Sequence, residues 1–161
     1  MSSVKTGTWN DHAKTHVDRI SLLGEMIQPT GVGDIRGYMD SIIDTFFDRE
    51  HLMDDDSVWL QLGAFAFNND KGYKFDADTV TEILISKQRD YGPDNIARFG
   101  VKGLIVRVHD KVARLENLTS NNREASNESI EDTFLDIIGY SAIGMMWMNN
   151  QFLAPLSADS L

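Results

Sequence analysis

Apolar residues recur at three- and four-residue spacing through nearly every long segment of this chain, and this periodicity limits the fold more than any other feature. Between residues 34 and 51, for example, they stand at Ile35, Met39, Ile42 and Phe46, which places them on one side of a helix. Few segments alternate apolar and polar residues as a half-buried strand would. We therefore predict an all-α protein, a bundle of about five to six helices.

Capping and turn residues divide the chain into successive helices. Asp34 is expected to cap the second helix, and Ser126 or Asn127 the last long one. Gly100 and Gly103 mark a predicted junction between two helices. The predicted helices of the bundle are 9–28, 34–51, 57–67, 77–90, 104–118 and 128–150, with a short helical segment at 95–99.

The chain carries a net charge of −10 and no cysteine. An acidic surface repels the phosphate backbone of DNA and RNA, so we expect no nucleic-acid polymer as a partner. Free nucleotides remain compatible with it, provided that metal ions screen their phosphates. Residues 1–19 are too polar for a signal peptide, and residues 137–148 are too few to span a bilayer. We expect a soluble cytoplasmic protein with no membrane partner.

Three carboxylates follow one another at helical spacing near the C-terminus. Glu128, Asp132 and Asp136 fall at i, i+4 and i+8, so in a continuous helix they would line one face. Like charges at this spacing repel each other unless the face is well solvated or a cation lies between them. The segment therefore indicates either a Mg²⁺ site beside the buried stripe of a bundle helix or a solvated acidic face.

A mixed cluster of cations, amides and an aromatic ring lies at a predicted helix break. Lys87, Tyr91 and Asn95 flank the Gly92-Pro93 pair. Lysine can pair with phosphate, and a tyrosine ring can stack on a base. The alternative is an ordinary helix C-terminus, where cations are favoured by the helix dipole.

The following helix carries charges at i, i+3, i+4 and i+7, namely Arg107, Asp110, Lys111 and Arg114. Ion pairs within the surface of one helix would explain this spacing. In the functional interpretation, Asp110 adds a carboxylate to the metal site while the cations bind phosphate.

Three sequence blocks, in this order, resemble the nucleotide-modification-associated domain found in phage genomes. They begin at Lys87, Gly103 and Glu128 and read KQRDYG, GLIVRVHDKVARLENL and ESIEDTFLDIIGY. That family is similar to the all-α nucleotide pyrophosphohydrolases of the MazG and dimeric dUTPase group. The resemblance, which covers about residues 80–148, implies a MazG-like catalytic core at 80–150, an N-terminal helical region at 1–79 that packs on or extends the bundle, and a tail at 151–161.

The metal-ligand pattern of the MazG group is only partly present. That group uses an E-x-x-E pair on one helix and an E-x-x-D pair on the next. Asp136 matches the final aspartate, but Thr133 stands where the pattern has glutamate. Asp110 is the best match on the preceding helix.

The resemblance implies a hydrolase that converts (deoxy)nucleoside triphosphates to monophosphates and pyrophosphate with Mg²⁺ or Mn²⁺. It also implies a homo-oligomer, dimeric or tetrameric, in the host-cell cytoplasm if the chain is phage-encoded. The alternative is a non-catalytic module that binds nucleotides or a host protein, because the ligand pattern is incomplete. The expected residues are Asp110, Glu128, Asp132 and Asp136 for the metal, Asp132, Asp136 and Lys111 for catalysis, and Lys87, Tyr91, Asn95, Arg107, Lys111 and Arg114 for the substrate.

Overall fold

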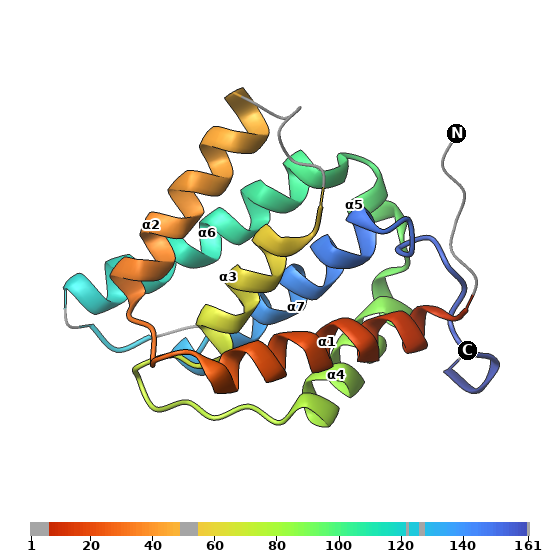
Figure 1. The fold of residues 1–161 in the computed structure, drawn as a ribbon, viewed down its shortest axis with the longest axis horizontal. Helices are drawn as coiled ribbons and strands as arrows, with labels where there is room; N and C mark the ends of the chain where they lie inside the picture. The colour runs from red at the N-terminus through yellow and green to blue at the C-terminus, as the bar shows by residue number, and fades with distance from the viewer. Residues whose placement is uncertain (1–6, 49–54, 122, 126–127, 161) are drawn as a thin grey trace.

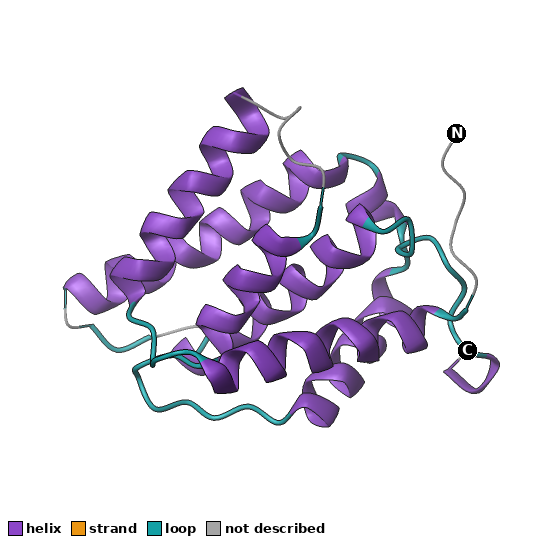
Figure 2. Ribbon diagram, in the orientation of Figure 1, coloured by secondary structure: helices purple, strands orange, loops and turns teal. Residues whose placement is uncertain are grey.

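The computed structural model describes residues 7–48, 55–121, 123–125 and 128–160. These residues form seven α-helices and no β-strand, which confirms the all-α prediction (Figures 1 and 2). The helices are α1 (Trp9–Met26), α2 (Val32–Ile43), α3 (Ser57–Phe67), α4 (Ala77–Tyr91), α5 (Asp94–Ala97), α6 (Gly100–Ser120) and α7 (Ile130–Met148). A π-helical turn, η1 (Asp44–Asp48), continues α2, and a 3-10 turn, η3 (Ala158–Ser160), lies near the C-terminus.

Helix α7 is the central element of the bundle. It packs against α3, α6 and α1, while α1 also packs against α3 and α4, and α2 covers α6 (Figure 1). Ten of its nineteen residues are buried, as expected for a helix that is apolar on most of its circumference. This position explains why α7 can present polar side chains toward two neighbouring helices at once.

A glycine allows α3 and α7 to approach closely. A Cβ atom added at Gly144 would lie 2.3 Å from the ring of Trp59, which is completely buried. The indole therefore packs directly on the α7 backbone. A larger residue at position 144 would push the two helices apart, because protein interiors have little free volume.

Two helices begin earlier than predicted. The N-cap of α2 is Gly31 rather than Asp34, and the Asp34 carboxylate accepts a hydrogen bond from the Gly31 amide at 3.2 Å. An acid in the first turn accepts a hydrogen bond from a free N–H group and is stabilised by the positive end of the helix dipole. Helix α6 likewise starts at Gly100, so Gly103 is helical rather than part of a junction. Glycine is required there because a Cβ atom would lie 2.5 Å from the Cβ of Phe99.

The last long helix begins later than predicted. Its N-cap is Ser129, whose hydroxyl accepts a hydrogen bond from the Asp132 amide at 3.0 Å. The two caps expected from the sequence, Ser126 and Asn127, lie outside the described residues. Glu128 therefore precedes the helix, and the expected face of three helical carboxylates is wrong for its first member.

Helices from residues 1–79 and from residues 80–150 contribute to one hydrophobic core. Trp9, Trp59, Leu104 and Phe134, which come from α1, α3, α6 and α7, all belong to it. The tail contributes as well, since Phe152 is buried in the same cluster. No helix within the described part of the chain is long and apolar enough to cross a membrane.

Candidate functional site

A cavity of about 300 Å³ lies among α4, α5, α6 and α7. Its wall contains six of the residues singled out from the sequence, which come from four different helices. One part of the wall is apolar and the other carries charge. The six residues are Lys87, Tyr91, Asn95, Arg107, Lys111 and Asp136.

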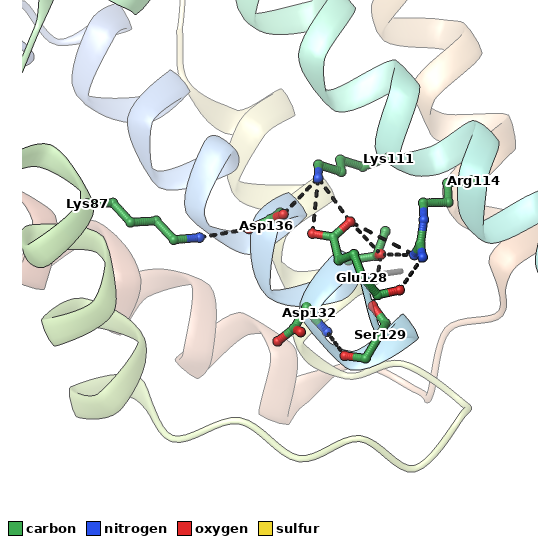
Figure 3. A network of polar contacts seen from close by, with 8 residues as sticks. Lys87, Lys111, Arg114, Glu128, Ser129, Asp132 and Asp136 are labelled. Carbon is green, nitrogen blue, oxygen red and sulfur yellow. Dashed lines mark hydrogen bonds and ion pairs between the residues drawn. The ribbon is translucent and has the colours of Figure 1, made fainter. Parts of the chain in front are cut away.

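Lys111 connects Asp136, which lines the cavity, with Glu128, which lies beside it and is not part of the wall. Its Nζ atom lies 2.8 Å from Oδ2 of Asp136 and 3.1 Å from both carboxylate oxygens of Glu128. Figure 3 shows the ammonium group between the two acids. A cation from α6 thus pairs with one acid on α7 and with one in the segment before it.

Asp136 has a second cationic partner across the cavity. Nζ of Lys87, on α4, lies 3.0 Å from Oδ1 of Asp136 (Figure 3). The Asp136 side chain is 15% exposed and that of Lys87 is 51% exposed. Lys87 therefore lies at the open side and can exchange its partner for a bound anion at small cost.

Asp136 and Lys111 are both ionised at neutral pH. Burial raises the pKa of the Asp136 carboxyl, but hydrogen bonds from the Lys111 and Lys87 ammonium groups outweigh this effect, so the pKa lies below its ordinary value. Burial lowers the pKa of Lys111, but its hydrogen bonds to Asp136 and Glu128 outweigh burial and raise it. The site therefore presents fixed charges of both signs.

Arg114 and Thr133 hold Glu128 from the other side. Nη1 of Arg114 donates to Oγ1 of Thr133 at 2.6 Å, and Nη2 donates to the backbone carbonyl of Glu128. Oγ1 of Thr133 also lies 3.2 Å from Oε2 of Glu128. The loop residue Glu128 is thereby tied to α6 and α7, and Arg114 contacts this network rather than the cavity wall.

Thr133 is completely buried, and its role was not predicted from the sequence. The sequence does carry a signal for it, since Thr133 follows Ile130 and precedes Ile137 on the apolar stripe of α7. A polar residue on a buried stripe needs a hydrogen-bond partner. That requirement would have indicated a contact to another element.

Two of the predicted metal ligands neither line the cavity nor pair with the Lys111 ammonium group. Asp132 is exposed in the first turn of α7, where the positive end of the helix dipole stabilises an acid. Asp110 is exposed on α6, and neither residue lines the cavity. Within the described ranges, no group of three His, Asp or Glu side chains is arranged to hold a metal ion by itself.

The amide residues of the cavity differ in their hydrogen bonding. Oδ1 of Asn95 accepts from the Ile96 amide at 2.9 Å, which leaves the Asn95 NH₂ group as a donor. Nη2 of Arg107 donates to the Asn95 backbone carbonyl at 3.4 Å and so links α6 to α5. Gln88, a cavity residue that the sequence did not single out, is only 9% exposed.

The part of the chain that builds most of the cavity has a counterpart among known protein families. No curated protein and no solved structure matches the chain. Residues 87–148, which run from Lys87 at the end of α4 through the whole of α7, match the family model described as nucleotide modification associated domain 1.

Proposed function

We propose that the cavity binds a nucleotide and that the protein hydrolyses nucleoside triphosphates to monophosphates and pyrophosphate with Mg²⁺ or Mn²⁺. The observation that carries the proposal is the two-sided character of the cavity, in which an apolar wall adjoins Lys87, Arg107, Lys111 and Asp136. Nucleotides have the same two-sided character, because a flat base is joined to a charged phosphate chain. The match of residues 87–148 to a family model described as nucleotide modification associated supports the same class of ligand.

The cations of the cavity supply the phosphate contacts. In a chain of net charge −10, Lys87, Arg107 and Lys111 line one small space. Such a local excess of positive charge attracts a multivalent anion. The arginine adds directional hydrogen bonds, and the lysines act as compact charges.

Glu128 and Asp136 are the residues that fit a divalent cation. Both carboxylates converge on one point, which the Lys111 ammonium contacts in the structure. Mg²⁺ is commonly held by one or two carboxylates together with substrate phosphates, so two acids suffice. When bound, the ion would neutralise phosphate charge and supply an activated water. Lys111 would exchange its carboxylate partners for the phosphate chain.

A second candidate function is nucleotide binding without turnover. It is favoured by the Lys111 ammonium, which already occupies the position between the two carboxylates. Within the described residues no third acid joins them. A protein of this kind would sequester a nucleotide rather than consume it.

The test is to incubate the protein with standard and modified nucleoside triphosphates plus Mg²⁺ and to separate the products by chromatography. Asp136→Asn should abolish pyrophosphate release. Asp132→Asn is the matched comparison, because it makes the same change on the same helix outside the cavity. Loss of activity in both variants would restore the four-carboxylate site predicted from the sequence.

The remaining outcomes separate the two functions. Nucleotide binding by calorimetry without any product supports the non-catalytic candidate. Absence of both binding and product across the whole panel would remove both. The expected homo-oligomer stays a prediction, and sedimentation at several protein concentrations tests it.

A further inference from the structure

Gln88 is a largely buried residue whose side-chain amide lines the cavity and is not used by the described part of the fold. It follows Thr81 and Leu84 on the buried face of α4 and is 9% exposed. Its backbone carbonyl is satisfied by the Gly92 amide at 2.8 Å. The described residues provide no hydrogen-bond partner for its side-chain amide, whose atoms reach the open space of the cavity that this side chain lines. The amide is therefore free to bind a ligand in the cavity.

Asn69 shows how this protein treats a buried amide that serves the fold. It is 3% exposed, and its NH₂ group donates to the carbonyls of Ala66 and Tyr73, each at 3.1 Å. Its carbonyl accepts from the amides of Lys71 and Tyr73, each at 3.2 Å. Gln88 differs because its side chain lines the cavity instead of bridging backbone groups.

The surroundings of Gln88 fit a flat heterocyclic ring. Val80, Leu84, Ile96 and Ile143 are all buried and line the same cavity. An apolar enclosure with one amide provides stacking surface together with one donor and one acceptor. Nucleobase edges present donors and acceptors side by side, and a glutamine amide can pair with two of them at once.

The geometry points to Gln88 as the residue that reads the nucleobase, with the base held at the apolar side of the cavity and the phosphates at Lys87 and Lys111. This assignment rests on the proposed function, because it takes the ligand to be a nucleotide. It moves base recognition from the exposed ring of Tyr91 to a buried group. Tyr91 is 71% exposed and lies at the rim.

The experiment measures the binding of eight standard ribo- and deoxyribonucleoside triphosphates and of inorganic triphosphate by calorimetry. Wild type is compared with Gln88→Met, which keeps the side-chain length and removes both polar atoms. We expect the preferred nucleotide to bind roughly 5- to 100-fold more weakly to the variant, the range expected for one bidentate base contact. Preferences among the bases should flatten, and inorganic triphosphate, which has no base, should bind equally well to both proteins.

Gln28→Met is the matched control, since the same change is made at an exposed position. Gln88→Glu gives a second readout, because a carboxylate accepts but does not donate. Its relative affinity should rise for guanine, which presents two adjacent donors, and fall for bases that need the amide donor.

The outcomes distinguish this inference from the proposed function. If the wild type binds nucleotides and Gln88→Met leaves its base preference unchanged, the inference is overturned and the proposed function stands. An equal loss of affinity for inorganic triphosphate would show a general structural role and also overturns it. A wild type that binds no member of the panel removes both proposals together.

Discussion

The buried hydroxyl of Thr133 should be one of the most sensitive positions in this protein. Replacing Thr133 with valine keeps the side-chain shape and removes only the oxygen. That oxygen accepts from Arg114 at 2.6 Å and lies 3.2 Å from Glu128 and 3.1 Å from the Ser129 carbonyl. Because a hydroxyl has one proton, it donates to one of the latter two at a time.

The expected cost follows from these contacts. A hydrogen bond from the charged Arg114 contributes about 1.5–3 kcal/mol, and the donated bond about 0.5–1.5 kcal/mol. We therefore expect Thr133→Val to lower the free energy of unfolding by about 2–4 kcal/mol. In a chain of this length this corresponds to a fall in Tm of about 5–15 °C.

A matched control isolates what the contacts of Thr133 with other parts of the chain contribute to stability. Thr81 is also a buried helical threonine, but among the described residues its hydroxyl bonds only to the Ala77 carbonyl four residues before it, at 2.9 Å. Thr81→Val should therefore cost about 1 kcal/mol. Unfolding in urea is monitored by circular dichroism at one fixed protein concentration. The comparison is valid only if the dependence of the unfolding free energy on urea concentration, the m value, is equal in all proteins.

Equal destabilisation by Thr133→Val and Thr81→Val, within about 0.5 kcal/mol, would refute the reasoning. It would mean that the Arg114 contact adds nothing to stability. Thr133→Ser, which keeps the hydroxyl, should recover most of the difference.

Three further predictions concern the site and the core. Lys111→Met removes the positive charge between two carboxylates, so Mn²⁺ measured by calorimetry without nucleotide should bind about tenfold more tightly; unchanged or weaker binding contradicts this. The lowered pKa of Asp136 means that its stabilising effect is present above the unfolded pKa near about 3.9 and is lost as the pH falls through the folded pKa. The difference in unfolding free energy between wild type and Asp136→Asn should therefore be constant near neutral pH and shrink below about pH 4; a difference that grows in acid would show the opposite shift. Gly144→Ala should destabilise the protein by about 3 kcal/mol in thermal unfolding, because Trp59 cannot move aside. Gly37→Ala, made where no atom lies within 4 Å, should instead stabilise by about 0.5–1 kcal/mol, and equal effects of the two changes would refute the packing argument.

Much of the candidate site could be predicted because cations, amides and an aromatic ring meet at one helix break, and further charges follow at helical spacing on the next helix. Five of the six predicted substrate-binding residues line one cavity with Asp136, and the sixth, Arg114, lies in the adjoining network. Gln88 and Thr133 were missed for a common reason. Each is a polar residue on the buried face of its helix. The groups that it faces, the partners of Thr133 and the cavity lined by Gln88, are formed in part by other helices.

The amino-acid sequence by itself determined that the chain is all-α, because helical periodicity is a local property that any segment carries alone. It also determined which side chains bear the charge of the site. Only the tertiary structure decided which carboxylates meet. Ser129, the residue after Glu128, is the N-cap of α7. Glu128 therefore lies outside the helix and reaches Lys111 from a loop, whereas Asp132 remains at the surface. The reason is physical: distances between elements depend on where each helix starts and how helices pack, and no spacing along the chain specifies either.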